Sequence, residues 1–166
     1  MRLDKFRTLY QAGAVKRYHT MRVHEHQSLA AHSWGVAMII VQISEEPPSA
    51  QLLQYALTHD LAEYETGDIP APVKWGNKEI SEGLSALEFD FERRHGIICD
   101  LTDQELLLLQ WADTFELVLY CWHEMRMGNN FVLPTYNRGK VRLKSYGFPT
   151  VKASDLFFNL IEEGTE

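Results

Sequence analysis

His59 and Asp60 are adjacent in the sequence, and Glu63 follows them within about one helical turn. An imidazole and a carboxylate placed side by side can both ligate one metal ion that lies against the flank of a helix. Two more polar residues, His32 and Asp113, stand in apolar surroundings. Each of these alone is more often a hydrogen-bonded core residue, because buried polar groups need partners. Together they predict a cage of two histidines and two carboxylates: His32, His59, Asp60 and Asp113.

Such a cage has a characteristic chemistry. Imidazole and carboxylate ligands suit first-row transition metals and exclude a thiolate site. These ligands suit Zn, Co, Mn, Fe or Ni, and of these we expect one divalent ion of Zn, Co or Mn as cofactor. Four protein ligands around a roughly octahedral ion leave room for water and for a substrate oxygen, and the ion lowers the pKa of that water and polarises a phosphoryl group. The cage therefore indicates a hydrolase.

The elements that must position these residues are predicted to be helices. Apolar residues recur at helical spacing, and Ser28 and the pair Thr102 and Glu105 are typical helix starts. The segment 67–72 contains a glycine and two prolines, which argues against a helix there. Basic residues alternate in 137–144, so a strand and a helix both remain open. The predicted helices span 3–13, 28–43, 49–65, 78–94, 102–127 and 153–161.

Length and composition limit the chain to one domain of ordinary globular type. Its 166 residues are 45% hydrophobic and 23% charged, which predicts a single all-α domain over 1–166, a bundle of about five to seven helices. The net charge of −7 argues against nucleic acid as a partner. Two cysteines exclude a disulfide-rich scaffold, and the apolar stretch 35–44 is too short to cross a bilayer. We therefore expect a cytoplasmic protein with no membrane partner.

Basic residues are unevenly distributed along the sequence. Many of the 16 lysines and arginines lie near the N-terminus, and none occurs between Arg22 and Lys74. Acidic residues occupy that gap. An acidic centre with cations supplied from elsewhere suits a metal site that handles a small anion, although chance patterning on a solvated surface would look the same.

The order of the cage residues carries a family resemblance. It resembles the H…HD…D signature of the HD-domain metal phosphohydrolases. The segment 59–75, HDLAEYETGDIPAPVKW, resembles the motif HD-x-x-E-x-x-x-GD-x-P-x-P-x-K of the 5′-deoxynucleotidase branch. The resemblance covers about 15–130, and the short chain is also similar to compact phage dATP triphosphohydrolases.

The resemblance implies a role for each matched residue. The four cage residues would be the metal ligands. Glu63 would orient or deprotonate the attacking water, and Asp68 would position that water or the leaving group. Lys74 would be aimed at phosphate by the rigid turn that precedes it, and Arg17 would contact sugar or phosphate. Tyr18 stands where the family has Trp, and would pack on the deoxyribose.

Two departures from the family pattern alter this picture. Gln110 stands three residues before Asp113, where relatives have Lys, so phosphate binding would fall to other bases. Ala31 replaces the acid that usually precedes the first histidine, so this histidine lacks a carboxylate next to it in the sequence. The remaining candidate phosphate ligands, besides any base of the C-terminal segment, are Arg17, Arg22, Lys74 and Lys78.

These residues predict a metal-dependent hydrolase of deoxynucleotides, with a small-molecule deoxynucleotide as its partner. The expected reaction is that of a dATP triphosphohydrolase, which releases deoxyadenosine and triphosphate, with additional Mg²⁺ on the triphosphate. The alternative is a deoxynucleoside 5′-monophosphatase on the same scaffold. A cyclic-nucleotide or alarmone phosphohydrolase is less favoured, and a non-enzymatic helical module would not need Glu63 and Asp68 beside the cage. A phage-encoded protein acting in a host cytoplasm would fit the similarity in size.

The long predicted helix also suggests assembly. It carries large apolar residues around more than one face, which is too many for one core-facing stripe. The resembling proteins are homo-oligomers, so we expect a symmetric interface that buries part of this surplus. The residues concerned are Trp111, Leu117, Tyr120, Cys121 and Trp122.

Overall fold

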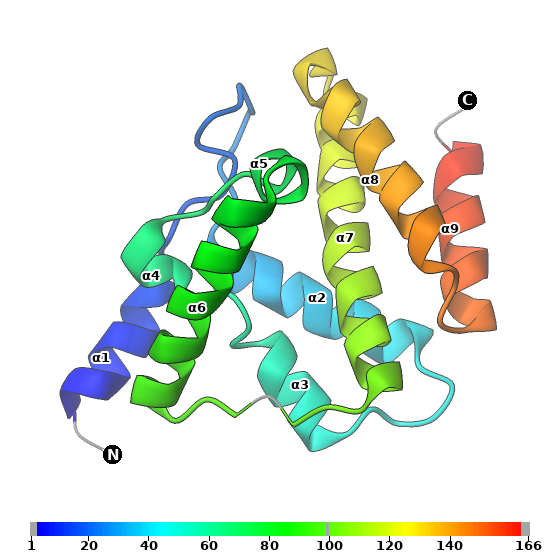
Figure 1. The fold of residues 1–166 in the computed structure, drawn as a ribbon. Helices are drawn as coiled ribbons and strands as arrows, with labels where there is room; N and C mark the ends of the chain where they lie inside the picture. Colours follow the sequence, from blue (N-terminus) through cyan, green and yellow to red (C-terminus); the bar gives the residue numbers. More distant parts are fainter. Residues whose placement is uncertain (1–2, 99, 164–166) are drawn as a thin grey trace.

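The computed structural model describes residues 3–98 and 100–163, and over these ranges it consists of helices and connecting loops without a strand (Figure 1). The all-α prediction is confirmed, whereas the predicted number of helices is too low, because the described residues form nine α-helices. None of these helices is both long and apolar enough to span a membrane. The elements are α1 (Leu3–Ala12), α2 (Leu29–Ile43), α3 (Ala50–Ala56), α4 (Glu63–Thr66), α5 (Ala71–Gly76), α6 (Lys78–His95), α7 (Asp103–Arg126), the short 3₁₀ helix η1 (Asn130–Val132), α8 (Leu133–Tyr146) and α9 (Val151–Glu163).

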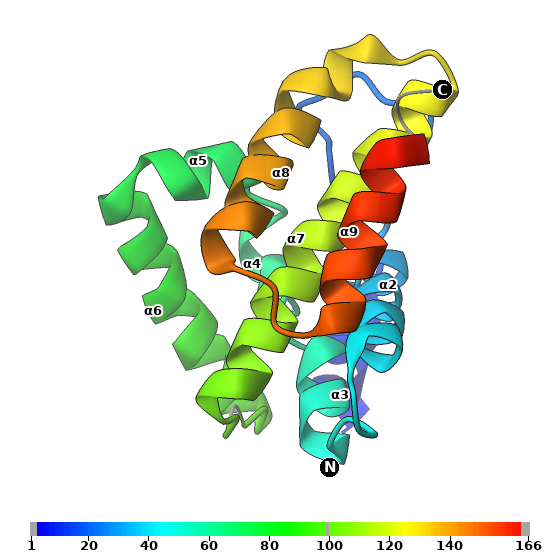
Figure 2. The ribbon, with the colours of Figure 1, turned by 90° about the vertical axis from the view of Figure 1, so that its right-hand side faces the viewer.

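Helix α7 lies in the middle of the molecule, with α8 along one side of it (Figures 1 and 2). It also packs against α2 and α3, and α9 packs against α2. Because α7 is covered on several sides, its large apolar residues pack within the single chain. They therefore give no support for a subunit interface, and the homo-oligomer stays a prediction. The residues assigned to a subunit interface are buried or half-buried here: Trp111, Leu117, Tyr120, Cys121 and Trp122.

Local sequence signals determine several helix starts. The Ser28 hydroxyl accepts a hydrogen bond from the backbone N–H of Ala31 at the start of α2 (3.2 Å). Thr102 and Glu105 form a reciprocal capping box at the start of α7. Both predicted starts are confirmed, and both depend only on residues three positions apart in the sequence.

The prediction of one continuous helix over 49–65 is wrong. Helix α3 ends at Ala56 and α4 begins at Glu63. His59 and Asp60 lie on the turns between them. The His59 ring donates a hydrogen bond from Nδ1 to the carbonyl oxygen of Ala56 (2.9 Å), which occupies an acceptor that a continuing helix would have used. A turn, rather than a helix face, therefore presents the His-Asp pair.

Two other segments were difficult to assign from periodicity. In 67–72, predicted to contain no helix, α5 already begins at Ala71, because a proline is tolerated in the first turn, where its missing N–H has no intrahelical partner anyway. The segment 137–144, open between strand and helix, belongs to α8. Within it, Gly139 lies where α8 approaches α7 closely, since a Cβ there would stand 2.6 Å from Cγ2 of Val118.

Replacing Gly139 by Ala should therefore lower the free energy of unfolding by about 1–3 kcal/mol, because the β-branched Val118 has little freedom to move aside. Gly83→Ala in α6 is the matched control, because nothing lies within 4 Å of a Cβ at that position. It should stabilise the protein by about 0.5–1 kcal/mol through helix propensity. Urea unfolding of both variants checks this, and a stabilising Gly139→Ala would contradict the close approach of α7 and α8.

Candidate metal centre and active site

The four predicted ligands come together in the structure. His32 is on α2 and Asp113 is on α7. The pair His59 and Asp60 is on the turn between α3 and α4. One ligand atom from each of the four lies within 4.8 Å of the others. Side chains from three separate parts of the chain thus converge on one small space that could hold a metal ion.

The two imidazoles are oriented as metal ligands would be. Nδ1 of His32 donates to Oε2 of Glu116 (2.7 Å), and Nδ1 of His59 donates to the Ala56 carbonyl. When a ring is neutral, as a metal ligand must be, these bonds place its proton on Nδ1 and leave Nε2 as an acceptor. Both Nε2 atoms are buried and have no hydrogen-bond partner.

Around these nitrogens stand further electron-pair donors. Oδ2 of Asp60 lies 3.3 Å from Nε2 of His59 and 3.5 Å from Nε2 of His32, and Oδ1 of Asp113 lies 3.2 Å from Nε2 of His32. Acceptors that face one another without a hydrogen bond repel unless a cation lies between them. The donor set, two nitrogens and two carboxylate oxygens, suits a divalent transition metal.

Glu116 supplies the carboxylate that the sequence lacks at position 31. It follows Asp113 by three residues on α7, so both project from the same side of the helix. Its Oε1 accepts a hydrogen bond from Nε2 of Gln27 (2.6 Å). Gly35 makes room for it, because a Cβ at that position would lie only 3.0 Å from Cγ of Glu116. Sequence reasoning missed this residue, although the spacing of Asp113 and Glu116 was a usable signal.

Arg17, Glu63 and Lys74 form a connected ion-pair group next to the cage. Nη1 of Arg17 lies 3.0 Å from Oδ2 of Asp60 and 3.9 Å from Oε2 of Glu63. Nζ of Lys74 lies 3.3 Å from Oε1 of Glu63. Burial, and next the charge of Asp60, raise the pKa of Glu63 to about 8. A carboxyl with that pKa can exchange a proton close to neutral pH.

Tyr18 is held in an unusual conformation beside this group. Its φ of +61° lies in the left-handed region, which bulky residues rarely adopt. Its backbone N–H donates to Oδ2 of Asp68 (3.1 Å), and its ring stacks on Tyr120 with centroids 4.0 Å apart. Both contacts offset the backbone strain and fix an aromatic wall, as expected of positions that are constrained for function.

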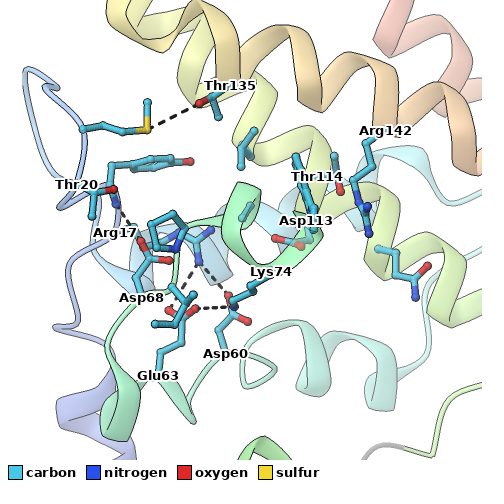
Figure 3. A pocket seen from close by; sticks show the side chains of 18 of the residues that line it. Arg17, Thr20, Asp60, Glu63, Asp68, Lys74, Asp113, Thr114, Thr135 and Arg142 are labelled. Atoms are coloured by element: carbon cyan, nitrogen blue, oxygen red, sulfur yellow. Dashed lines mark hydrogen bonds and ion pairs between the residues drawn. The ribbon is translucent and has the colours of Figure 1, made fainter. Parts of the chain in front are cut away.

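A pocket of about 280 Å³ lies beside the cage (Figure 3), and His32 and His59 are not among the residues that line it. Besides Asp60 and Asp113, five of the predicted site residues line it, namely Arg17, Tyr18, Glu63, Asp68 and Lys74. The pocket also contains Gln110, already noted in the sequence. Lining residues that sequence reasoning did not single out for the site include Thr114 of α7 and, from α8, Thr135, Arg142 and Tyr146.

Two predicted phosphate ligands do not line this pocket. The guanidinium of Arg22 packs over the ring of Phe131, at 5.9 Å, in a separate hollow. Lys78 is largely exposed and lies 3.5 Å from Glu82, on the rim of a hollow that adjoins the pocket and shares Lys74 with it. A role for either residue in substrate binding stays a prediction.

Residues 5–162 match the profile of the family described as 5′-deoxynucleotidase YfbR-like. The chain belongs to this family. The YfbR-like relatives include a 5′-deoxynucleotidase of Shewanella oneidensis, 29% identical over 89% of this chain and 87% of the relative. Another is the 5′-deoxynucleotidase YfbR of Salmonella typhi, 28% identical over 75% of this chain and 74% of the relative. The predictions of an HD-domain phosphohydrolase and of an enzyme are confirmed by this membership.

Solved structures show that the fold is shared as well. A cyanophage S-2L HD phosphohydrolase, DatZ, bound to dA and one catalytic Zn²⁺ ion, superposes with a TM-score of 0.69 at 22% identity, covering 99% of both chains. An HD-domain phosphohydrolase of Listeria innocua gives a TM-score of 0.79 at 21% identity, covering 97% of this chain and 88% of that one. At these identities the likeness concerns the fold alone.

Glu116→Gln should weaken Zn²⁺ binding by about 10- to 100-fold. The amide is uncharged, so it is a weaker acceptor for Nδ1 of His32 and orients the ring less firmly than the carboxylate does. Glu124→Gln is the matched control. Glu124 is also a buried acid of α7, and it accepts hydrogen bonds from His24 and Asn129 rather than from a cage residue. Competition with a chelator measures the affinity, and equal losses in the two variants would contradict a specific role for Glu116.

Proposed function

We propose that the protein is a metal-dependent hydrolase of 2′-deoxynucleotides that breaks the bond between the 5′ oxygen and the phosphorus, releasing the deoxynucleoside. The observation that carries this proposal is the convergence of four ligand atoms within 4.8 Å beside a pocket that also contains Arg17, Lys74 and Arg142. A metal cage next to several cations suits a phosphate ester. The names of the relatives, 5′-deoxynucleotidases, support a deoxynucleotide as substrate.

The cage residues would hold one divalent transition metal, Zn, Co or Mn, through two imidazole nitrogens and two carboxylates. When bound, such an ion polarises the phosphoryl group and lowers the pKa of water. The catalytic Zn²⁺ in the DatZ structure supports zinc as the first ion to test. The proposed ligands are His32, His59, Asp60 and Asp113.

The other pocket residues have separable tasks in this proposal. Glu63, buried beside Asp60, orients the attacking water and accepts its proton. Arg17 and Lys74, held by their ion pairs, stabilise the negative charge that grows on the phosphoryl oxygens. Asp68 holds the backbone of Tyr18 and so positions the aromatic wall against the sugar.

The specific reaction that we propose is hydrolysis of dATP to deoxyadenosine and triphosphate. The deoxyadenosine bound in DatZ, which has nearly the same length as this chain, supports the base and the product. A triphosphate chain would carry Mg²⁺ as a second, looser ion. The alternative, a 5′-monophosphatase acting on deoxynucleoside monophosphates, is supported by the names of the relatives. Both reactions break the same bond, so the cage serves either.

Replacing Glu63 by Gln should lower kcat by about 10²- to 10⁴-fold while the bound metal is retained, because the amide cannot accept a proton. Asp60→Asn should lose both the metal and the activity. Metal analysis of the purified variants, together with rates of deoxynucleoside release, measures the two effects. A Glu63→Gln protein that has lost its metal would show that Glu63 is a ligand rather than the base.

Product analysis decides between the two substrates. With dATP the protein should release deoxyadenosine and intact triphosphate in equal amounts, and dAMP should be hydrolysed more slowly. Chromatography of both reactions, with ATP as a control for the 2′-hydroxyl, measures this. Fast release of phosphate from dAMP with no triphosphate from dATP would move the function to the monophosphatase alternative and leave the metal site unchanged.

A further inference from the structure

Arg142, on α8, is clamped by two aromatic rings. Its guanidinium carbon lies 4.7 Å from the ring centre of Trp75 on α5 and 5.2 Å from that of Tyr146 on α8. Its Nε donates a hydrogen bond to the hydroxyl of Tyr146 (2.6 Å). Among the described residues the two terminal Nη atoms have no hydrogen-bond partner and no carboxylate within 4.0 Å. The side chain is thus held in place while its strongest donors remain available.

The other two cations of the pocket are already paired. Arg17 lies against Asp60 at 3.0 Å, and Lys74 lies against Glu63 at 3.3 Å. Aromatic rings hold a guanidinium without neutralising its charge, whereas carboxylates do neutralise it. Arg142 is therefore the one cation among the described lining residues whose charge is not balanced by an acid.

The charge balance of the whole pocket leads to the same residue. When all four carboxylates of the lining are ionised, a divalent ion in the cage together with Arg17 and Lys74 balances them, and Arg142 is the remaining cation of the lining that can offset a phosphate chain. A substrate with one phosphate places its charge at the cage itself, whereas each additional phosphate needs a further cation. The four carboxylates are Asp60, Glu63, Asp68 and Asp113.

Arg142 also stands where a phosphate chain could leave the cage. In Figure 3 it lies on the other side of Asp113 from Arg17 and Thr20. It lines both the pocket and the adjoining hollow, which it shares with Lys74 and Lys78. A phosphate chain that starts at the cage and runs past Lys74 into that hollow would therefore have Arg142 and Lys78 beside it.

We propose that Arg142 binds the phosphates beyond the one that is attacked, and that it thereby selects nucleoside triphosphates over monophosphates. This inference rests on the proposed function and assigns to that site a residue that determines specificity. Trp75 and Tyr146 act as positioning residues, because they hold the guanidinium in a fixed direction without contacting the reacting atoms. Lys78 adds a second, more exposed charge in the adjoining hollow.

The test compares binding rather than turnover, on the metal-loaded Glu63→Gln protein, with and without Arg142→Gln. Calorimetry with dATP, dAMP and inorganic tripolyphosphate gives the three affinities. Arg142→Gln should lower the affinities for dATP and tripolyphosphate by about 10- to 100-fold, because a charge-assisted contact is lost. The same substitution should change the affinity for dAMP by less than about threefold.

Arg138→Gln is the matched control. Arg138 is exposed on the same helix, one turn earlier, and its substitution removes the same charge. It should leave all three affinities nearly unchanged. Tyr146→Phe keeps the ring and removes only the hydrogen bond to Nε, so it should cause a smaller loss confined to dATP and tripolyphosphate. This variant also covers the case in which Arg142→Gln fails to fold.

The outcomes separate this inference from the proposed function. Equal weakening of dAMP and dATP would overturn the inference, because Arg142 would then contact the base, the sugar or the first phosphate. No weakening of either would overturn it as well. If dAMP is hydrolysed normally and the Arg142 variant behaves as wild type, the inference fails and the proposed function stands. If tripolyphosphate binds through Arg142 while no deoxynucleotide is hydrolysed, the function fails and the anion site stands.

Discussion

The main constraint on this structure is the mutual repulsion of several carboxylates that lie around one small space. Four acids line the same pocket, and at such distances like charges repel unless cations lie between them. The chain itself supplies Arg17, whose Nη1 lies 3.0 Å from Oδ2 of Asp60. Burial is the largest single influence and would lower the pKa of Arg17, but the charges of Asp60, Glu63 and Asp113 and the neighbouring Tyr18 together outweigh it and hold that pKa above its usual range. The guanidinium therefore stays charged inside the protein, and the remaining repulsion favours a metal ion in the cage.

Two acids of the pocket, together with Glu116 of α7, also hold the loop between α1 and α2. Asp68 accepts the backbone N–H of Tyr18, and Glu116 accepts a hydrogen bond from Gln27 near the end of the loop. Asp60 binds Arg17 in between. The loop that carries the pocket residues Arg17 and Tyr18 is thus held by acids around the cage. A change in the charge of the cage should therefore alter the position of the Tyr18 ring as well as metal binding, because acids in and around the cage also hold the loop that carries Tyr18.

Much of the fold and of the cage could be predicted from the sequence, because their signals are local or chemically distinctive. The caps at Ser28 and Thr102 involve residues three positions apart, and the cage residues are polar side chains in apolar surroundings. The break after Ala56 could not be predicted, because it depends on a bond from the His59 ring and on the distant Arg17. Residues of α8 were missed for a similar reason: their environment is made by helix packing, which periodicity does not contain.

The position of Arg142 suggests how the pocket can bind phosphates although position 110 is a glutamine rather than a lysine. Both residues line the pocket, but Gln110 is on α7, one turn before the cage residue Asp113, whereas Arg142 is on α8. A lysine at 110, as in the resembling proteins, would stand one turn from Asp113 and could be neutralised by it. A cation on α8, held by Trp75 and Tyr146, keeps its full charge for the substrate. In the proposed role, this cation on α8 therefore attracts the phosphates that follow the one at the cage.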